Sequence, residues 1–173
     1  MKTIVSVVMG SDSDLPIVKD AIKILDEFGV PYEIHILSAH RTPDETLAFA
    51  KNASKRGVKV IIAAAGGAAH LAGVIASHFP LVVIGIPIKT PTLFGIDSLY
   101  SIVQMPPGIP VATVGINGAQ NASLLAVQIL ATSDKKLEKK LTEYKKNLSK
   151  KVLEKSEKLK KLGVDRYLAE GKK

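Results

Sequence analysis

The sequence contains no cysteine and no tryptophan among its 173 residues. Without cysteine, the chain forms no disulfide, holds no thiolate metal site and has no cysteine nucleophile. Its histidines also lack the close spacing of a zinc site; they are His35, His40, His70 and His78. No Ser-His-Asp arrangement or pair of catalytic carboxylates is evident. We therefore expect no bound metal and no hydrolase of these classes.

The charge of +8 is not spread along the chain. Residues 1–133 hold nine basic and nine acidic residues, whereas residues 134–173 hold fifteen basic and seven acidic ones. In this second part, apolar residues from Leu137 to Leu162 recur at the three- and four-residue spacing of an amphipathic helix. A solvated helix face explains the lysines better than binding to a phosphate backbone. We therefore expect no nucleic-acid partner.

A stretch without charge runs from Lys59 to Lys89 and raises the question of a membrane span. Glycine, histidine, serine and proline interrupt it, as a strand, loop, helix and strand would require. The β-branched clusters at 60–62 and 82–84 are typical of buried parallel strands. The N-terminus begins directly with a predicted strand and has no signal-peptide pattern. We expect a soluble, cytoplasmic protein that does not bind a membrane.

Five short apolar runs alternate with helical segments. The predicted strands are Ile4–Met9, Tyr32–Leu37, Val58–Ala64, Leu81–Ile86 and Pro110–Val114. The predicted helices are Leu15–Phe28, Asp44–Lys55, Ala68–Ser77, Ile96–Val103 and Ala119–Ala131, followed by a long one from Asp134 to about Leu162. This order predicts an α/β fold: a flavodoxin-like, three-layer αβα sandwich with a parallel sheet of about five strands. We expect a single domain over 1–173, comprising a core (1–133) and a lysine-rich C-terminal helix and tail (134–173).

The loop after the first predicted strand, 10–14, contains one glycine, two serines and two aspartates. Glycine permits a sharp turn, and the hydroxyls of Ser11 and Ser13 with the amides of the following helix suit an anion. With one glycine and no lysine, the loop is neither a dinucleotide fingerprint nor a P-loop. Asp14 either caps the following helix or hydrogen-bonds the hydroxyls of a sugar.

The loop after the second predicted strand reads Ser38-Ala39-His40-Arg41-Thr42, and Pro43 opens the next helix with Thr42 as its N-cap. Ligands of open α/β sheets bind at this edge, where the strands end. His40 is suited to proton transfer near neutral pH, and Arg41 is suited to a phosphate or carboxylate. Local hydrogen bonds of His40 and a surface ion pair of Arg41 remain the alternatives.

Small residues dominate the loop after the third predicted strand, from Ala65 to Gly73. They allow backbone amides to approach a flat ligand, although tight packing of strand and helix would also select them. After the fourth strand, the segment 87–92 carries Lys89, Thr90 and Thr92. The short helix that follows, within 95–106, either walls the same pocket or forms an interface. The residues alone thus predict a small phosphorylated ligand and one histidine for proton transfer.

Five segments, taken in their order and spacing, extend this interpretation. They are GSDSD (10–14), SAHRTP (38–43), AGGAAHL (65–71), GIPI (85–88) and DSLYSIVQMP (97–106). Together they resemble the N5-carboxyaminoimidazole ribonucleotide mutase family of bacterial purine biosynthesis. The resemblance implies an isomerase without cofactor or metal, which moves a carboxylate from the exocyclic nitrogen of an aminoimidazole ribonucleotide to ring carbon 4. It implies that His40 is the general acid–base, acting through decarboxylation and recarboxylation.

The resemblance also implies the binding residues. Ser11 and Arg41 are expected on the phosphate, and Asp14 on the ribose with Ser38 assisting; Ser13 is expected among the substrate-binding residues. The remaining expected contacts, to the base and the carboxylate, are Gly66, Gly67, Ala68 and His70. The sequence departs from the family pattern at Ala64, where glycine is common, and at Ala72, where proline is common, and both changes bear on loop geometry.

The family is octameric with sites shared between subunits. We expect the same here, using apolar surface that includes the helix 122–131 and the final helix. The related carboxylase, which uses aminoimidazole ribonucleotide and carbon dioxide directly, is the nearest alternative. A flavodoxin-type binding or electron-transfer module is another, but the three loops contain no Trp, Tyr or Phe to stack on a flavin.

Overall fold

The computed structural model, which describes residues 2–171, is built on one parallel sheet. The strand order is β2-β1-β3-β4-β5, and the strands are β1 (Val5–Met9), β2 (Tyr32–Ile36), β3 (Val60–Gly66), β4 (Val82–Ile88) and β5 (Ala112–Thr113). The predicted five-stranded parallel sheet is confirmed. The three central strands are buried almost throughout because helices cover both faces of the sheet, which explains their runs of Val and Ile.

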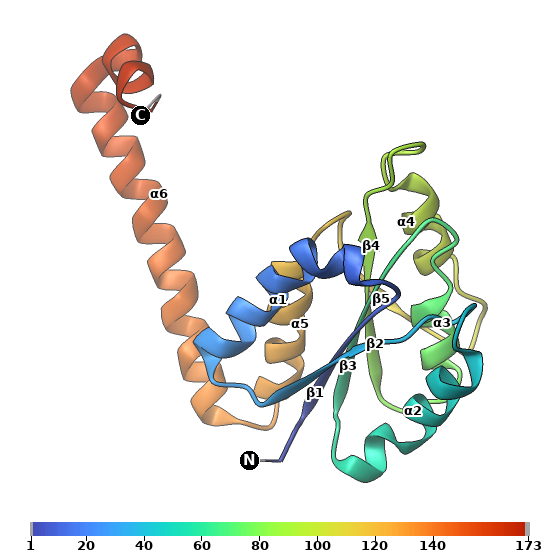
Figure 1. The fold of residues 1–173 in the computed structure, drawn as a ribbon. Helices are drawn as coiled ribbons and strands as arrows, with labels where there is room; N and C mark the ends of the chain where they lie inside the picture. The colour runs from blue at the N-terminus through green and yellow to red at the C-terminus, as the bar shows by residue number, and fades with distance from the viewer. Residues whose placement is uncertain (1, 172–173) are drawn as a thin grey trace. The chain divides into compact units, whose positions relative to one another are not determined.

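The helices form the outer two layers of the sandwich (Figure 1). They are α1 (Leu15–Phe28), α2 (Pro43–Arg56), α3 (Leu71–Ala76), α4 (Ile96–Val103) and α5 (Ala119–Ala131). The chain continues in α6 (Lys135–Glu170), which belongs to a separate compact unit. Helices α1 and α5 lie on one face of the sheet, and α2, α3 and α4 lie on the other (Figure 1). The short 3-10 helix η1 (Asp12–Asp14) precedes α1.

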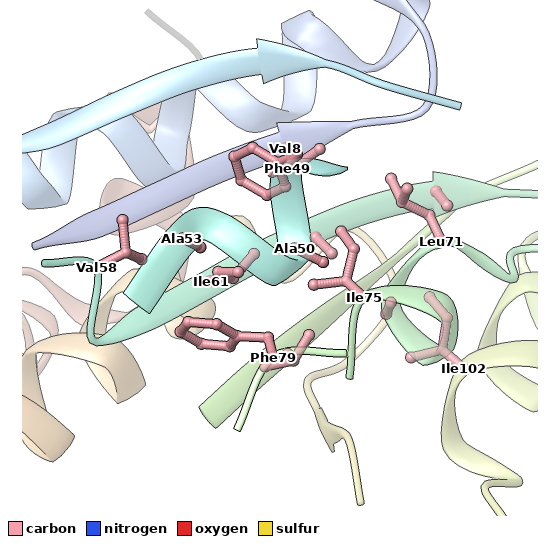
Figure 2. Packing of buried hydrophobic residues seen from close by; sticks show 14 of the residues in the cluster. Val8, Phe49, Ala50, Ala53, Val58, Ile61, Leu71, Ile75, Phe79 and Ile102 are labelled. Carbon is pink, nitrogen blue, oxygen red and sulfur yellow. The ribbon is translucent and has the colours of Figure 1, made fainter. Parts of the chain in front are cut away.

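A core cluster joins α2, α3 and α4 to the sheet, as Figure 2 shows. Phe49 of α2, Ile75 of α3 and Ile102 of α4 pack with strand residues such as Ile61. Burying one such side chain contributes about 1.5–3 kcal/mol relative to exposing it. This packing holds the starts of α2 and α3, and therefore the loops before them, against the ends of the strands.

The predicted boundaries of several elements were wrong, most clearly those of β5, α3, β3 and β4. Strand β5 has two residues rather than five, since only Ala112 and Thr113 pair with β4. Helix α3 begins at Leu71 rather than Ala68, because Gly67 adopts a left-handed φ of 69° and the chain turns before the helix. Strands β3 and β4 continue to Gly66 and Ile88, which pair with each other.

The chain forms two compact units, Met1–Leu130 and Ala131–Lys173. In the second unit the predicted long helix is present, and Asp134 caps it by accepting from the amides of Lys136 and Leu137. Gly163, with φ 72° and ψ 168°, interrupts the helix one residue after its predicted end at Leu162. Within residues 2–171, none of the helices combines the length and apolar character that crossing a bilayer requires.

Candidate active site

A cleft of about 550 Å³ lies at the carboxyl edge of the sheet, where β1, β2, β3 and β4 end. The strand order reverses between β1 and β3, which is where open α/β sheets bind their ligands. The cleft is lined by Gly10, Ser11, Ser13, Asp14, Ser38, Ala39, His40, Arg41, Ala65, Gly66, Ala68, His70, Leu71, Ile88, Lys89, Thr90 and Pro91. Three loops identified in the sequence therefore meet in one site.

The loop after β1 supplies two hydroxyls and a buried carboxyl group. The hydroxyls of Ser11 and Ser13 line the cleft beside Asp14, which is only 7% exposed. Although Asp14 stands at the N-cap of α1, its side chain makes no capping hydrogen bond, so the capping alternative was wrong. Burial raises the pKa of Asp14 above its ordinary value, against the opposing effects of hydrogen bonds from Ser11 and Ser13 and of the nearby Arg41 charge.

The loop after β2 carries His40 and Arg41. The Arg41 guanidinium donates to the carbonyl oxygen of Gly10 over 2.8 Å, so it links this loop to the one after β1. Ser38 accepts from the Arg41 backbone amide at 3.2 Å. Thr42 occupies the predicted N-cap position, but its hydroxyl binds the backbone of Ser38 and does not cap α2. These bonds close a tight turn that exposes His40 to the cleft.

The loop after β3 brings Gly66, Ala68 and His70 to the cleft. Gly67 differs from the expectation, since it is absent from the lining and its amide donates to the Ser98 hydroxyl at 3.0 Å. Ser98 is fully buried on α4 and donates in turn to the carbonyl oxygen of Ile88. Sequence reasoning gave Ser98 no individual role, and its only signal was its place in the segment DSLYSIVQMP (97–106).

The loop after β4 forms the fourth wall, through Ile88, Lys89, Thr90 and Pro91. The short helix within 95–106, for which the sequence left a pocket wall or an interface open, contributes no side chain to the lining of this cleft. Asn117 holds the Lys89 amide at 2.9 Å, and the Thr90 hydroxyl donates to the carboxylate of Asp97 on α4 at 2.9 Å. Lys89 thus adds a second cationic residue to the cleft, besides Arg41 of the loop after β2.

The cleft combines hydroxyls, two cations, one buried carboxyl group and two histidines. This set suits an anionic, hydroxyl-bearing ligand and a proton-transfer reaction on it. His40 and His70 meet within the cleft, with 2.9 Å between Nε2 of His40 and Nδ1 of His70. Across residues 2–171, no three His, Cys, Asp or Glu side chains gather in a way that would hold a metal ion.

Comparisons with known proteins agree on one family. A family model described as AIR carboxylase matches residues 4–151. The N5-carboxyaminoimidazole ribonucleotide mutase of Pyrococcus horikoshii is 57% identical over 169 residues, covering 98% of this chain and 96% of that protein. The phosphoribosylaminoimidazole carboxylase of Schizosaccharomyces pombe is 56% identical over 166 residues, covering 96% of this chain but 30% of that protein.

A solved structure agrees with these sequence matches. The crystal structure of Treponema denticola PurE superposes with a TM-score of 0.84 at 31% sequence identity. The superposition covers 91% of this chain and 99% of that chain. The sheet, its helices and the loops around the cleft therefore belong to an architecture seen in a crystal structure.

Proposed function

The chain belongs to the AIR carboxylase family, and we propose that it works as an N5-carboxyaminoimidazole ribonucleotide mutase, an isomerase of de novo purine biosynthesis. One observation carries this proposal. The chain is 57% identical to mutases along 96% of their length, and three of the motifs that support the resemblance, at 10–14, 38–43 and 65–71, line a single cleft. The carboxylase of Schizosaccharomyces pombe is a longer protein, of which this chain corresponds to 30%.

The phosphate of the ribonucleotide is assigned to the loops after β1 and β2. Ser11 and Ser13 offer hydroxyl donors, and Arg41 offers a guanidinium held by the carbonyl oxygen of Gly10. A guanidinium binds phosphate through charge-assisted hydrogen bonds, which are roughly twice as strong as neutral ones. Asp14 and Ser38, which lie beside them, are assigned to the ribose hydroxyls.

The base and its carboxylate are assigned to the loop after β3. Gly66 and Ala68 have no bulky side chain and lie along the cleft wall, so a planar imidazole can approach the backbone closely. Because the amide of Gly67 already donates to Ser98, Gly67 supports the loop from behind. Direct contact with the base and carboxylate is therefore assigned to Gly66, Ala68 and His70.

Carboxylate migration requires one group that gives and then takes a proton. Protonated His40 donates to the exocyclic nitrogen as its bond to the carboxylate breaks, which leaves an amine and carbon dioxide. Ring carbon 4 then attacks the trapped carbon dioxide, and neutral His40 removes the proton from that carbon. His40 is protonated again at the end, so protons balance and no other reactant is needed. Confinement in the cleft supplies the effective concentration that carbon dioxide in solution would lack.

We also propose an octamer with sites shared between subunits. Five large apolar side chains in the segment 93–103 are each at least 45% exposed, namely Leu93, Phe94, Ile96, Tyr100 and Val103. This segment follows directly on the cleft residues Thr90 and Pro91, so a neighbouring subunit that covered it would lie beside the site. The expected contribution of the helix 122–131 is smaller, because Ala122, Ala126 and Val127 are already buried within the chain. Light scattering should give eight times the 18.5 kDa mass of one chain; a mass of one or two chains would exclude the octamer.

The test of the activity is turnover of the two candidate substrates offered separately. A mutase converts N5-carboxyaminoimidazole ribonucleotide to the 4-carboxy isomer without ATP or bicarbonate. A direct carboxylase instead consumes aminoimidazole ribonucleotide with bicarbonate. Turnover of the second pair alone would overturn the mutase assignment while leaving the family and the site intact.

A further inference from the structure

His40 has an unusual partner for a group that must move protons. Its Nε2 lies 2.9 Å from Nδ1 of His70, and the two rings meet edge to face at 87°. This is the distance of a full N–H···N hydrogen bond, in which one nitrogen carries the hydrogen and the other offers a lone pair. The orienting partner of His40 is therefore a second imidazole.

Hydrogen bonds hold the backbone around each histidine, through the Ser38–Thr42 turn for His40 and through α3 for His70. Both are exposed, so packing does not fix either ring. The backbone of His70, however, is anchored: its neighbours Ala69 and Leu71 are buried at 1% and 2% exposure, and its carbonyl oxygen accepts from the Val74 amide in α3. His40 lies in a turn between β2 and α2.

Proton counting selects the direction of the hydrogen bond. When His40 acts as an acid it is an imidazolium, and both of its nitrogens carry hydrogen. Its Nε2–H can then donate only to a neutral His70 whose Nδ1 is unprotonated, since two N–H groups cannot face each other at 2.9 Å. If the same bond persists after His40 has given up a proton, the proton lost is the one on Nδ1.

We propose that His70 is a positioning residue that accepts from Nε2 of His40 throughout the cycle, and that Nδ1 of His40 is the atom that exchanges protons with the substrate. His70 thereby holds neutral His40 in the single tautomer whose Nδ1 lone pair is ready for the ring proton. Molecules in which neutral His40 carries its hydrogen on Nδ1 could not accept the ring proton at that atom, so a mixture of tautomers would lower kcat. This inference rests on the proposed function for its kinetic consequences, but the tautomer itself does not depend on any substrate.

The kinetic experiment compares His70→Ala, His70→Asn and His78→Ala with the unmodified protein on N5-carboxyaminoimidazole ribonucleotide. In the asparagine variant, Oδ1 takes the place of Nδ1 as an acceptor, so the hydrogen bond is kept without a second titrating group. His78 is an exposed histidine that does not line the cleft, and its variant is the matched control.

We expect His70→Ala to lower kcat by about 10- to 100-fold, part of the 10²–10⁴ that an acid–base group supplies. The loss of kcat should exceed any rise in KM, which reports the contact of His70 with the base and carboxylate, and His70→Asn should recover most of kcat. A raised KM at unchanged kcat would show that His70 only contacts the substrate, and an asparagine variant as slow as the alanine variant would also overturn the proposal. If the unmodified protein turns over neither ribonucleotide, the proposed function fails instead.

Nuclear magnetic resonance tests the hydrogen bond without turnover. Long-range proton–nitrogen spectra distinguish the two neutral tautomers of each histidine, and the signals of His40 are those missing from His40→Asn. At a pH where His40 is neutral, we expect one tautomer with the hydrogen on Nε2, and a mixture of tautomers in His70→Ala. Two results would contradict the proposal: hydrogen on Nδ1 of His40 in the unmodified protein, or the same single tautomer of His40 in His70→Ala as in the unmodified protein.

Discussion

Asp14 is a buried carboxyl group in a cleft assigned to an anionic ligand. Its raised pKa, caused first by burial, means that keeping it ionised at pH 7 costs folding free energy. This cost is present above the raised pKa of the folded protein and fades as pH falls through it. We infer that the carboxyl group of Asp14 serves to bind the ligand, although its burial lowers the stability of the folded protein.

Asp14→Asn separates these two effects. We predict that the variant unfolds at a temperature higher by a few degrees, since about 1 kcal/mol corresponds to roughly 2–4 °C for a domain of this size. The same variant should raise KM by about tenfold, because a charged acceptor for sugar hydroxyls is lost. Calorimetry and steady-state kinetics on one preparation would measure both. A variant that is less stable, with unchanged KM, would show that Asp14 has a structural role.

Strand β2 positions the His40 loop, and a carboxylate holds this strand to its neighbours. Glu33 on β2 accepts from the hydroxyl of Ser6 on β1 at 2.6 Å and from the guanidinium of Arg56 on α2 at 2.9 Å. Burial opposes ionisation of Glu33, but these two hydrogen bonds outweigh it and hold its pKa below the ordinary value.

Glu33→Gln should therefore reduce the free energy of unfolding by about 1 kcal/mol near neutral pH. Because the pKa of the folded state is lowered, the stabilisation is complete above the unfolded value of about 4.3 and is lost as pH falls through the folded value below it. Urea unfolding at pH 7 and pH 3 should show a difference between variant and parent that shrinks at the lower pH. A difference that is equal at both values would assign the effect to packing.

Helix α4 lies close to β4 because Gly85 has no side chain. A Cβ at this position would come within 2.3 Å of Cγ2 of Ile102, which is fully buried, and within 3.2 Å of Cγ1 of Val111. Gly85→Ala should cost about 1–3 kcal/mol of stability, as overpacking of a core does. Gly115→Ala is the matched control, since a Cβ there meets nothing within 4 Å. Equal stability of the two variants in urea unfolding would show that α4 can shift away from the sheet.

Strong periodicity made some elements predictable from sequence. Helices α1, α4 and α5 begin and end where their apolar spacing predicted, and β1 and β2 were each one residue shorter than predicted. The length of strand β5 was not predictable, because it depends on which of its residues form backbone hydrogen bonds with β4. Asp14 and Thr42 occupy N-cap positions as their residue types favour, yet their side chains serve other contacts.

The site as a whole was predictable to the level of loops. The sequence placed three loops at one edge of a parallel sheet, and all three line the cleft. What it could not supply were contacts across loops, such as the 2.9 Å contact between His40 and His70, thirty residues apart, and the Ser98 bonds behind the glycine loop. Those contacts depend on strand register and on the packing of α4, neither of which has a local sequence signal.

The central claim for the whole molecule is that one cleft carries out both halves of a carboxylate migration with His40 as the only proton carrier to the substrate. The most direct measurement is the kcat of His40→Asn on N5-carboxyaminoimidazole ribonucleotide, together with the dissociation constant of the 4-carboxy product. We predict a loss of kcat of about 10³-fold or more, since both proton transfers lose their carrier, with a dissociation constant within about threefold of the parent's. A variant that keeps a tenth or more of the parental kcat would contradict the claim.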